Sequence, residues 1–164
     1  MLIKNPISVL IFDWGDTIMR DFNLPGPMAT WKKVAYIPGA QKALETVSAK
    51  YICVIATNAN HSGTNEMIEA LKRVGANTYF RHFFSSKDLG YQKPDPRFFS
   101  SITEKLGIKP ENAVMIGNLY EKDIVGAKMA GMQTVLFDEK QQVIDFPDAD
   151  MVIHHLDELI NIFR

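Results

Sequence analysis

Short apolar runs alternate along the chain with segments of helical periodicity, and this alternation constrains the fold more than any other feature of the sequence. The runs are ISVLIF (7–12), YICVIAT (51–57), HFFSS (82–86), AVMIG (113–117), QTVLF (133–137) and MVIHH (151–155). Helices are expected between and after them, over 38–50, about 63–74, 96–106, about 120–130 and 156–163. Strands that are apolar throughout are typical of sheets buried on both faces. The alternation therefore predicts an α/β fold in which helices cover both faces of a central parallel sheet.

Two of the expected helices carry sequence signals for their ends. Asp95 is a favourable N-cap for the 96–106 helix, with Pro96 at the first helical position and Gly107 after the last turn. Gly75 is expected to stop the preceding helix. These signals define the boundaries of the two helices more closely than periodicity does.

The length of 164 residues suits one domain with a sizeable core and is short for two. We therefore expect a single domain over 1–164. The chain contains no internal repeat, linker or low-complexity tract. Its least regular segment is MRDFNLPGPMATWKKVAYIP (19–38), which is long for a connection and is interpreted as a flap or minimal cap.

Charge and composition argue against several classes of partner. Eighteen Lys and Arg residues balance 19 Asp and Glu residues, so the net charge of −1 supplies no strong field for nucleic acid or an anionic membrane. No apolar run approaches the length of a transmembrane helix, and the first residues, MLIKNPISVLIFD, lack the features of a signal peptide. Cys53 is the only cysteine, so one chain forms no disulfide framework. We expect a cytoplasmic protein without a nucleic-acid or membrane partner.

Polar residues follow the predicted strands where ligands bind in an open parallel sheet, beyond the carboxyl ends of the strands. They are Asp13 and Asp16 after the first strand, Thr57 and Asn58 after the second, Lys93 before the 96–106 helix, and Asn118 and Asp123 after the AVMIG strand. Ionised carboxylates are expensive to bury without a partner or a metal. If the sheet forms as predicted, these groups converge on one site.

The converging groups suit phosphoryl transfer through a carboxylate nucleophile. A carboxylate that attacks a phosphate dianion meets a repulsion of about 4 kcal/mol per unit-charge pair, at about 4 Å and an effective dielectric near 20. A magnesium ion held by Asp13, Asp123 and the Asn118 side chain would offset this repulsion, together with the Lys93 ammonium. Asp13 would then become a transient aspartyl-phosphate that water hydrolyses.

The remaining residues of the set have a functional and a structural interpretation. Thr57, Asn58 and nearby backbone N–H groups would hold phosphate oxygens. Alternatively, Thr57 is only the N-cap of the next helix, and Lys93 is a solvated turn lysine. Asn118 and Asp123 also suit the start of a helix, where a negative charge is favourable, and this role is compatible with metal binding.

The order hhhhDxxxT, hhhT, K-P and hhhGNxxxxD, where h is apolar, resembles that of the haloacid dehalogenase-like superfamily, most of whose members are magnesium-dependent phosphatases. The matching residues are Asp13 to Thr17, Thr57, Lys93, and Gly117-Asn118 to Asp123, with KPDPRFF and GAKMAGMQTV in the expected places. Each motif is weak alone, and their combination in this order is specific. The resemblance implies a Rossmann-like three-layer α/β sandwich and a phosphatase that uses Mg²⁺.

The resemblance also implies roles for individual residues of this chain. The implied catalytic residues are Asp13 as nucleophile, Thr57 and Lys93, with Asp16 as a candidate acid/base; phosphate is bound by Thr57, Asn58 and Lys93, and Mg²⁺ by Asp13, the Gly15 carbonyl, Asn118 and Asp123. The implied substrate is a phosphorylated small molecule or a larger phosphorylated partner.

The first motif departs from the family pattern, because Gly15 stands where the family usually has a second Asp, the general acid and base of its phosphatases. A missing general acid slows the chemistry by about 10²- to 10⁴-fold. Asp16 lies one residue later and is interpreted either as a catalytic substitute or as a structural anchor of the loop. Asn118 replaces the usual Asp and weakens the expected metal site. The alternative function is therefore a non-catalytic or nearly inactive phosphate- and Mg²⁺-binding module.

Family members often carry a cap domain, and this chain has no room for a full one. An open site suits a large substrate, or a lid supplied by 19–38 or by the other subunit of a homodimer. Trp14 and Trp31 either frame the entrance or pack in the core. His61 is interpreted as an ordinary loop histidine.

Overall fold

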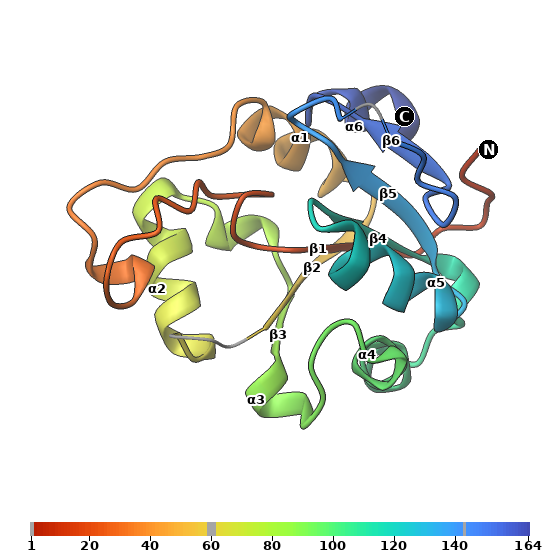
Figure 1. Ribbon diagram of the computed structural model, residues 1–164, viewed down its shortest axis with the longest axis horizontal. Helices are drawn as coiled ribbons and strands as arrows, with labels where there is room; N and C mark the ends of the chain where they lie inside the picture. Colours follow the sequence, from red (N-terminus) through yellow and green to blue (C-terminus); the bar gives the residue numbers. More distant parts are fainter. Residues whose placement is uncertain (1, 59–61, 143) are drawn as a thin grey trace.

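The computed structural model describes residues 2–58, 62–142 and 144–164, and these residues form an α/β sandwich around a parallel sheet (Figure 1). The strands are β1 (Val9–Phe12), β2 (Ile52–Thr57), β3 (His82–Ser85), β4 (Ala113–Gly117), β5 (Gln133–Phe137) and β6 (Met151–Ile153). Their order is β3-β2-β1-β4-β5-β6, and every pairing is parallel. The predicted parallel sheet is confirmed.

Helices cover both faces of the sheet, so the predicted three-layer arrangement is confirmed. The α-helices are α1 (Ala40–Val47), α2 (Thr64–Val74), α3 (Ser86–Leu89), α4 (Pro96–Leu106), α5 (Gly126–Met129) and α6 (Glu158–Ile162). Short 3-10 helices lie at Met28–Thr30 (η1), Asn77–Tyr79 (η2) and Pro110–Asn112 (η3), and a π-helical turn, η4, spans Tyr120–Val125. Figure 1 shows α1 and α6 on one side of the strands and α4 on the other.

Successive residues of the strands belong to different cores, because side chains alternate across a strand. In β1, Leu10 and Phe12 join the core beneath α1, α2 and α6. Val9 and Ile11 join the core beneath α4 and α5, which includes Phe98. The sheet is therefore buried on both faces, which explains why its central strands are apolar throughout.

The predicted helix signals are found where the sequence places them. The Asp95 side chain accepts a hydrogen bond from the backbone N–H of Arg97 (2.9 Å), and α4 begins at Pro96. Gly107 and Gly75 end α4 and α2 in the left-handed conformation. These local signals mark both ends of α4 and the C-terminal end of α2.

The helix predicted over about 120–130 is divided into η4 and α5, and the short helix α3 was not predicted. A Cβ on Gly126, where α5 begins, would lie 2.3 Å from the carbonyl oxygen of Pro94. The start of α5 thus packs directly against the backbone of Pro94. The π-helical turn η4, which is wider than an α-helical turn, lies immediately before this contact. π-helical turns of this kind are frequent at functional sites.

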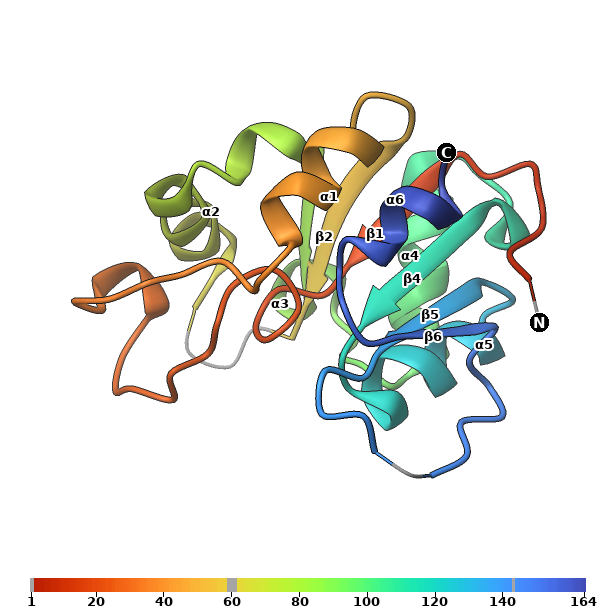
Figure 2. The ribbon, with the colours of Figure 1, turned by 90° about the horizontal axis from the view of Figure 1, so that it is seen from above.

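The 19–38 segment lies beside α2, to one side of the strands, with little regular structure of its own (Figure 2). Its residues Met28 and Trp31 are buried in the core beneath α1 and α2. Arg73 of α2 also donates from Nη1 to the carbonyl oxygen of Trp31, at 2.5 Å. These contacts join the segment to α2 on one side of the strand ends.

No helix in the ranges 2–58, 62–142 and 144–164 is both long and apolar enough to cross a membrane.

Candidate active site

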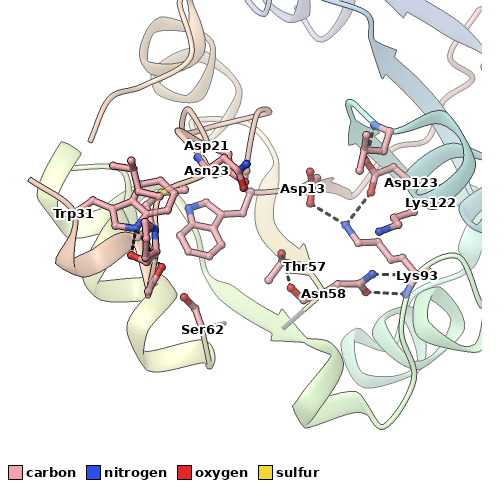
Figure 3. A pocket seen from close by; sticks show the side chains of 17 residues that line it. Asp13, Asp21, Asn23, Trp31, Thr57, Asn58, Ser62, Lys93, Lys122 and Asp123 are labelled. Atoms are coloured by element: carbon pink, nitrogen blue, oxygen red, sulfur yellow. Dashed lines mark hydrogen bonds and ion pairs between the residues drawn. The ribbon is translucent and has the colours of Figure 1, made fainter. Parts of the chain in front are cut away.

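The ammonium group of Lys93 lies between two carboxylates at the carboxyl ends of β1 and β4. Its Nζ is 2.8 Å from Oδ1 of Asp13 and 2.8 Å from Oδ1 of Asp123. Asp13 directly follows β1, and Asp123 lies in η4. Figure 3 shows the three side chains converging, and all three are buried. The structure therefore brings together three residues with predicted roles: Asp13 as nucleophile, Asp123 as metal ligand and Lys93 as the cation that offsets the phosphate charge.

The charges of this group control its protonation. Burial alone lowers the pKa of Lys93, but the carboxylates of Asp123 and Asp13 outweigh it, so its pKa lies above the ordinary value. Burial and the charge of Asp13 raise the pKa of Asp123, and Lys93 opposes that rise. With two carboxylates and one ammonium, the centre carries one net negative charge when all three are ionised. A cation is needed before a phosphate dianion is attracted to it.

The side-chain amide of Asn58 fixes the backbone of Lys93. Its Oδ1 accepts from the Lys93 backbone N–H (2.8 Å), and its Nδ2 donates to the Lys93 carbonyl oxygen (3.2 Å). The Lys93 ammonium also donates to the carbonyl oxygen of Ala56 in β2 (3.1 Å). Asn58, predicted to bind phosphate, thus has its amide engaged in holding the lysine in place (Figure 3).

Asp123 occupies a position that only a glycine at 117 allows. A Cβ on Gly117 would lie 2.4 Å from Oδ2 of Asp123. That oxygen accepts a hydrogen bond from the backbone N–H of Leu119 (3.0 Å), which holds the carboxylate against the end of β4. The Gly-Asn pair at the start of the fourth motif therefore has a steric reason for its glycine.

The residues predicted to hold Mg²⁺ present oxygen donors near one another. The Thr17 hydroxyl lies 3.3 Å from Oδ2 of Asp13 and 3.2 Å from Oδ1 of Asn118, so these two oxygens are neighbours. Asp13 and Asp123 in turn share Lys93. Carboxylate and amide oxygens are suitable Mg²⁺ ligands. Among the described residues no group of three or more Asp, Glu, His or Cys side chains is placed to hold a metal, and the expected donor set contains only two carboxylates, those of Asp13 and Asp123.

A cavity of about 320 Å³ opens above the Lys93 centre. Its floor includes Asp13, Lys93, Asp123 and Thr57. The 19–38 segment supplies much of its opposite wall through Asp21, Asn23, Leu24, Pro25, Met28 and Trp31 (Figure 3). The volume lies within the range of small-ligand sites. Because Trp14 and Trp31 line this cavity and are also buried, the two interpretations of these residues are compatible.

Asp16 has a different environment from Asp13. Its backbone is left-handed, with φ of 56°. Its Oδ1 accepts from the backbone N–H of Asp21 (3.0 Å) and lies 3.6 Å from Nη1 of Arg20. The side chain lines a neighbouring cavity together with Asn118, whereas Gly15 lines the cavity above Lys93. In this arrangement the Asp16 carboxylate is bound to its own loop.

Asp21 and Lys122 line the cavity and were not predicted as site residues. Asp21 lies in a segment without periodicity, so no strand end or helix turn indicates where its side chain goes. Lys122 is adjacent to Asp123 and could have been suggested by that position. His61 lies outside the described residues.

The fold and the site define a Rossmann-like domain with a carboxylate–ammonium centre at its strand ends. A model of the haloacid dehalogenase-like hydrolase family matches residues 16–137, which is more than half of the chain. The protein therefore belongs to the haloacid dehalogenase-like hydrolase family. The matched range begins after Asp13. The assignment of Asp13 to the site therefore rests on its place at the end of β1 and on its 2.8 Å ion pair with Lys93.

Two curated relatives are similar to parts of the chain. A glyceraldehyde 3-phosphate phosphatase of Pyrococcus furiosus is 31% identical over 133 residues, covering 78% of this chain and 54% of the relative. The glyceraldehyde 3-phosphate phosphatase of Methanopyrus kandleri is 43% identical over 67 residues, covering 41% of this chain and 29% of the relative. The chain thus spans about half or less of the length of these relatives.

A solved structure supports the fold over nearly the whole chain. The HAD phosphatase from Thermococcus onnurineus superposes with a TM-score of 0.79 at 23% identity, covering 95% of this chain and 97% of that one. At this identity the similarity concerns the fold.

Proposed function

We propose that the protein is a Mg²⁺-dependent phosphatase that forms an aspartyl-phosphate on Asp13. The observation that carries this proposal is the Lys93 ammonium, held 2.8 Å from both Asp13 and Asp123 on the floor of an open cavity. A buried carboxylate beside a fixed cation has the requirements of a nucleophile for an anionic substrate. The names of the curated relatives, which are phosphatases, agree with this assignment.

The proposed first step is attack by a carboxylate oxygen of Asp13 on the phosphorus of the substrate. Lys93 offsets part of the negative charge at the moment of attack, and its fixed position avoids reorganisation. Thr57 lies on the same floor of the cavity, and its hydroxyl donates in the structure to the carbonyl oxygen of Asn58 (3.3 Å). We assign to this hydroxyl a hydrogen bond to a phosphate oxygen.

The oxygens that would hold Mg²⁺ are those of Asp13, the Gly15 carbonyl, Asn118 and Asp123. Bound to these oxygens, the ion would supply the positive charge that the centre lacks for binding a phosphate dianion. The chain's own contribution is to keep Asp123 in place through the Leu119 N–H and Lys93.

The substrate proposed is a phosphorylated small molecule. The cavity of about 320 Å³ is large enough for one, and its wall from the 19–38 segment mixes apolar with polar side chains. The phosphate would lie next to Asp13 and Thr57, close to the charge of Lys93, and the remainder of the molecule would lie against Leu24 and Trp31.

Steady-state turnover of p-nitrophenyl phosphate and acetyl phosphate with Mg²⁺ tests the proposal, with Asp13→Asn as the control. We expect phosphate release by the wild type, its loss on removal of Mg²⁺ with a chelator, and its loss in Asp13→Asn. The departures at Gly15 and Asn118 favour a second candidate, a module that binds phosphate and Mg²⁺ without turnover. Mg²⁺-dependent phosphate binding with no turnover of either compound would support that candidate.

A further inference from the structure

The carboxylate of Asp21 lies beside the position from which the missing side chain of residue 15 would project. A Cβ built on Gly15 meets only Asp21 within 4 Å, at 3.8 Å from its Cβ and 3.9 Å from its Oδ2. Both residues line the cavity that contains Asp13 and Lys93. Figure 3 shows Asp21 on the side of the cavity away from Lys93 and Lys122.

The backbone does not require a glycine at position 15. Its φ lies outside the left-handed region, and the contacts of an added Cβ are ordinary van der Waals distances. What the glycine does is leave open the space between the end of β1 and the 19–38 segment. Asp21 projects into that space.

Hydrogen bonds hold Asp21 in this position. Its backbone N–H donates to Oδ1 of Asp16 (3.0 Å), and its own Oδ1 accepts from the backbone N–H of Asn23 (2.8 Å). Oδ2, the oxygen nearer to Gly15, has no partner among the residues that the structure describes. One oxygen is thus anchored while the other is available to a ligand.

We propose that Asp21 is the general acid and base of the reaction, in place of the absent Asp at position 15; this inference rests on the proposed phosphatase function. Asp16 is the positioning residue that holds Asp21 through its backbone N–H. The catalytic proton is thereby carried by the 19–38 segment instead of the loop that follows β1.

The proton transfers balance over the two steps. As an oxygen of Asp13 bonds to phosphorus, the bond from phosphorus to the leaving oxygen breaks, and Asp21 gives its proton to that oxygen. The products are an alcohol, the aspartyl-phosphate and an ionised Asp21. Asp21 then takes a proton from water as the water oxygen attacks phosphorus. The bond to Asp13 breaks, inorganic phosphate is released, and Asp21 is protonated again.

The experiment compares two substrates that differ in their need for an acid. Glycerol phosphate releases an alkoxide that requires a proton, whereas p-nitrophenyl phosphate releases a stable phenolate. For Asp21→Asn we expect kcat/KM to fall about 10²- to 10⁴-fold on glycerol phosphate and much less on p-nitrophenyl phosphate. Asp157→Asn, the same change at an exposed residue outside the cavity, should leave both unchanged.

A rescue variant separates a lost proton donor from a disturbed loop. Because the space at Gly15 admits a Cβ, the double variant Gly15→Asp/Asp21→Asn should fold and recover roughly tenfold or more of the lost glycerol phosphate activity. A merely structural role for Asp21 predicts equal losses on both substrates and no recovery.

The outcomes distinguish this inference from the function on which it rests. Turnover of glycerol phosphate by the wild type, with Asp21→Asn within about threefold of it, would overturn the role of Asp21 alone. Equal losses on both substrates, or no recovery in the double variant, would do the same. No turnover of either substrate by the wild type would overturn the proposed function and this role together.

Discussion

The two sides of the cavity are built in different ways. On the sheet side, Asp13, Lys93 and Asp123 are 7%, 4% and 0% exposed, and each is fixed by strand ends or by hydrogen bonds to backbone groups. On the other side, Asp21 and Leu24 are exposed residues of an irregular segment. The charged centre is therefore part of the core. Asp21 on the opposite wall is held only by hydrogen bonds with residues near it in the sequence, and Leu24 is exposed.

This difference has an energetic consequence. A change on the sheet side disturbs buried charges and close packing, so stability and activity should fall together. A change at Asp21 or Leu24 removes an exposed group, and such a substitution alters stability by about 0.5 kcal/mol or less. There, activity should change alone.

The largest effect is expected for Lys93→Met. Two buried carboxylates would lose their shared partner, and breaking a buried ion pair costs about 3–5 kcal/mol. Urea unfolding should show this loss, and phosphatase activity should fall below detection. Lys122→Met, which removes an exposed lysine of the same cavity, should retain the wild-type stability. Equal stability of the two variants would contradict the comparison.

A smaller effect is expected for Gly126→Ala. Its Cβ would lie 2.3 Å from the Pro94 carbonyl oxygen and 2.7 Å from the Phe99 ring, so the backbone next to Lys93 must move. We expect a loss of about 1–3 kcal/mol in the free energy of unfolding and of about 10²-fold in kcat. Urea unfolding and p-nitrophenyl phosphate turnover measure the two quantities.

Gly90→Ala is the matched control for this variant. Gly90 has φ of +78°, and an added Cβ there meets nothing within 4 Å. The change should reduce stability through backbone strain while kcat stays at the wild-type value. A fall in kcat for both variants would show that any loss of stability reaches the site.

The smallest effect is expected for Leu24→Ala on the 19–38 segment. Leu24 lines the cavity and is 47% exposed, so its removal takes away apolar contact with the substrate. KM for a phosphorylated small molecule that the wild type hydrolyses should rise a few-fold with kcat unchanged, because the apolar contact is the same in the ground state and the transition state. An unfolding midpoint shifted as far as that of Gly126→Ala would show that Leu24 contributes to the core, as Met28 and Trp31 of the same segment do.

The sequence predicts the sheet side well because its signals are local. Asp13 and Asp123 follow apolar strands whose carboxyl ends must meet at one edge, and α4 is bounded by Asp95 and Gly107. The division of the predicted 120–130 helix could not be foreseen in this way. It depends on the approach of Gly126 to Pro94, a contact between distant segments.

The other side of the cavity resists prediction for the same reason. Asp16 and Asp21 carry the same side chain in an irregular segment, and no periodicity distinguishes them. Their difference arises from the left-handed backbone of Asp16 and from its hydrogen bond to the Asp21 N–H. The space left by Gly15 becomes meaningful only when Asp21 is seen beside it.

The most direct test of the account is to identify the residue that carries the phosphoryl group. The protein is mixed with Mg²⁺ and acetyl phosphate, quenched in acid, digested, and analysed by mass spectrometry. We expect one added phosphoryl group on Asp13, absent from Asp13→Asn. Phosphate release at the wild-type rate by Asp13→Asn, or a phosphoryl group on any other residue, would contradict it.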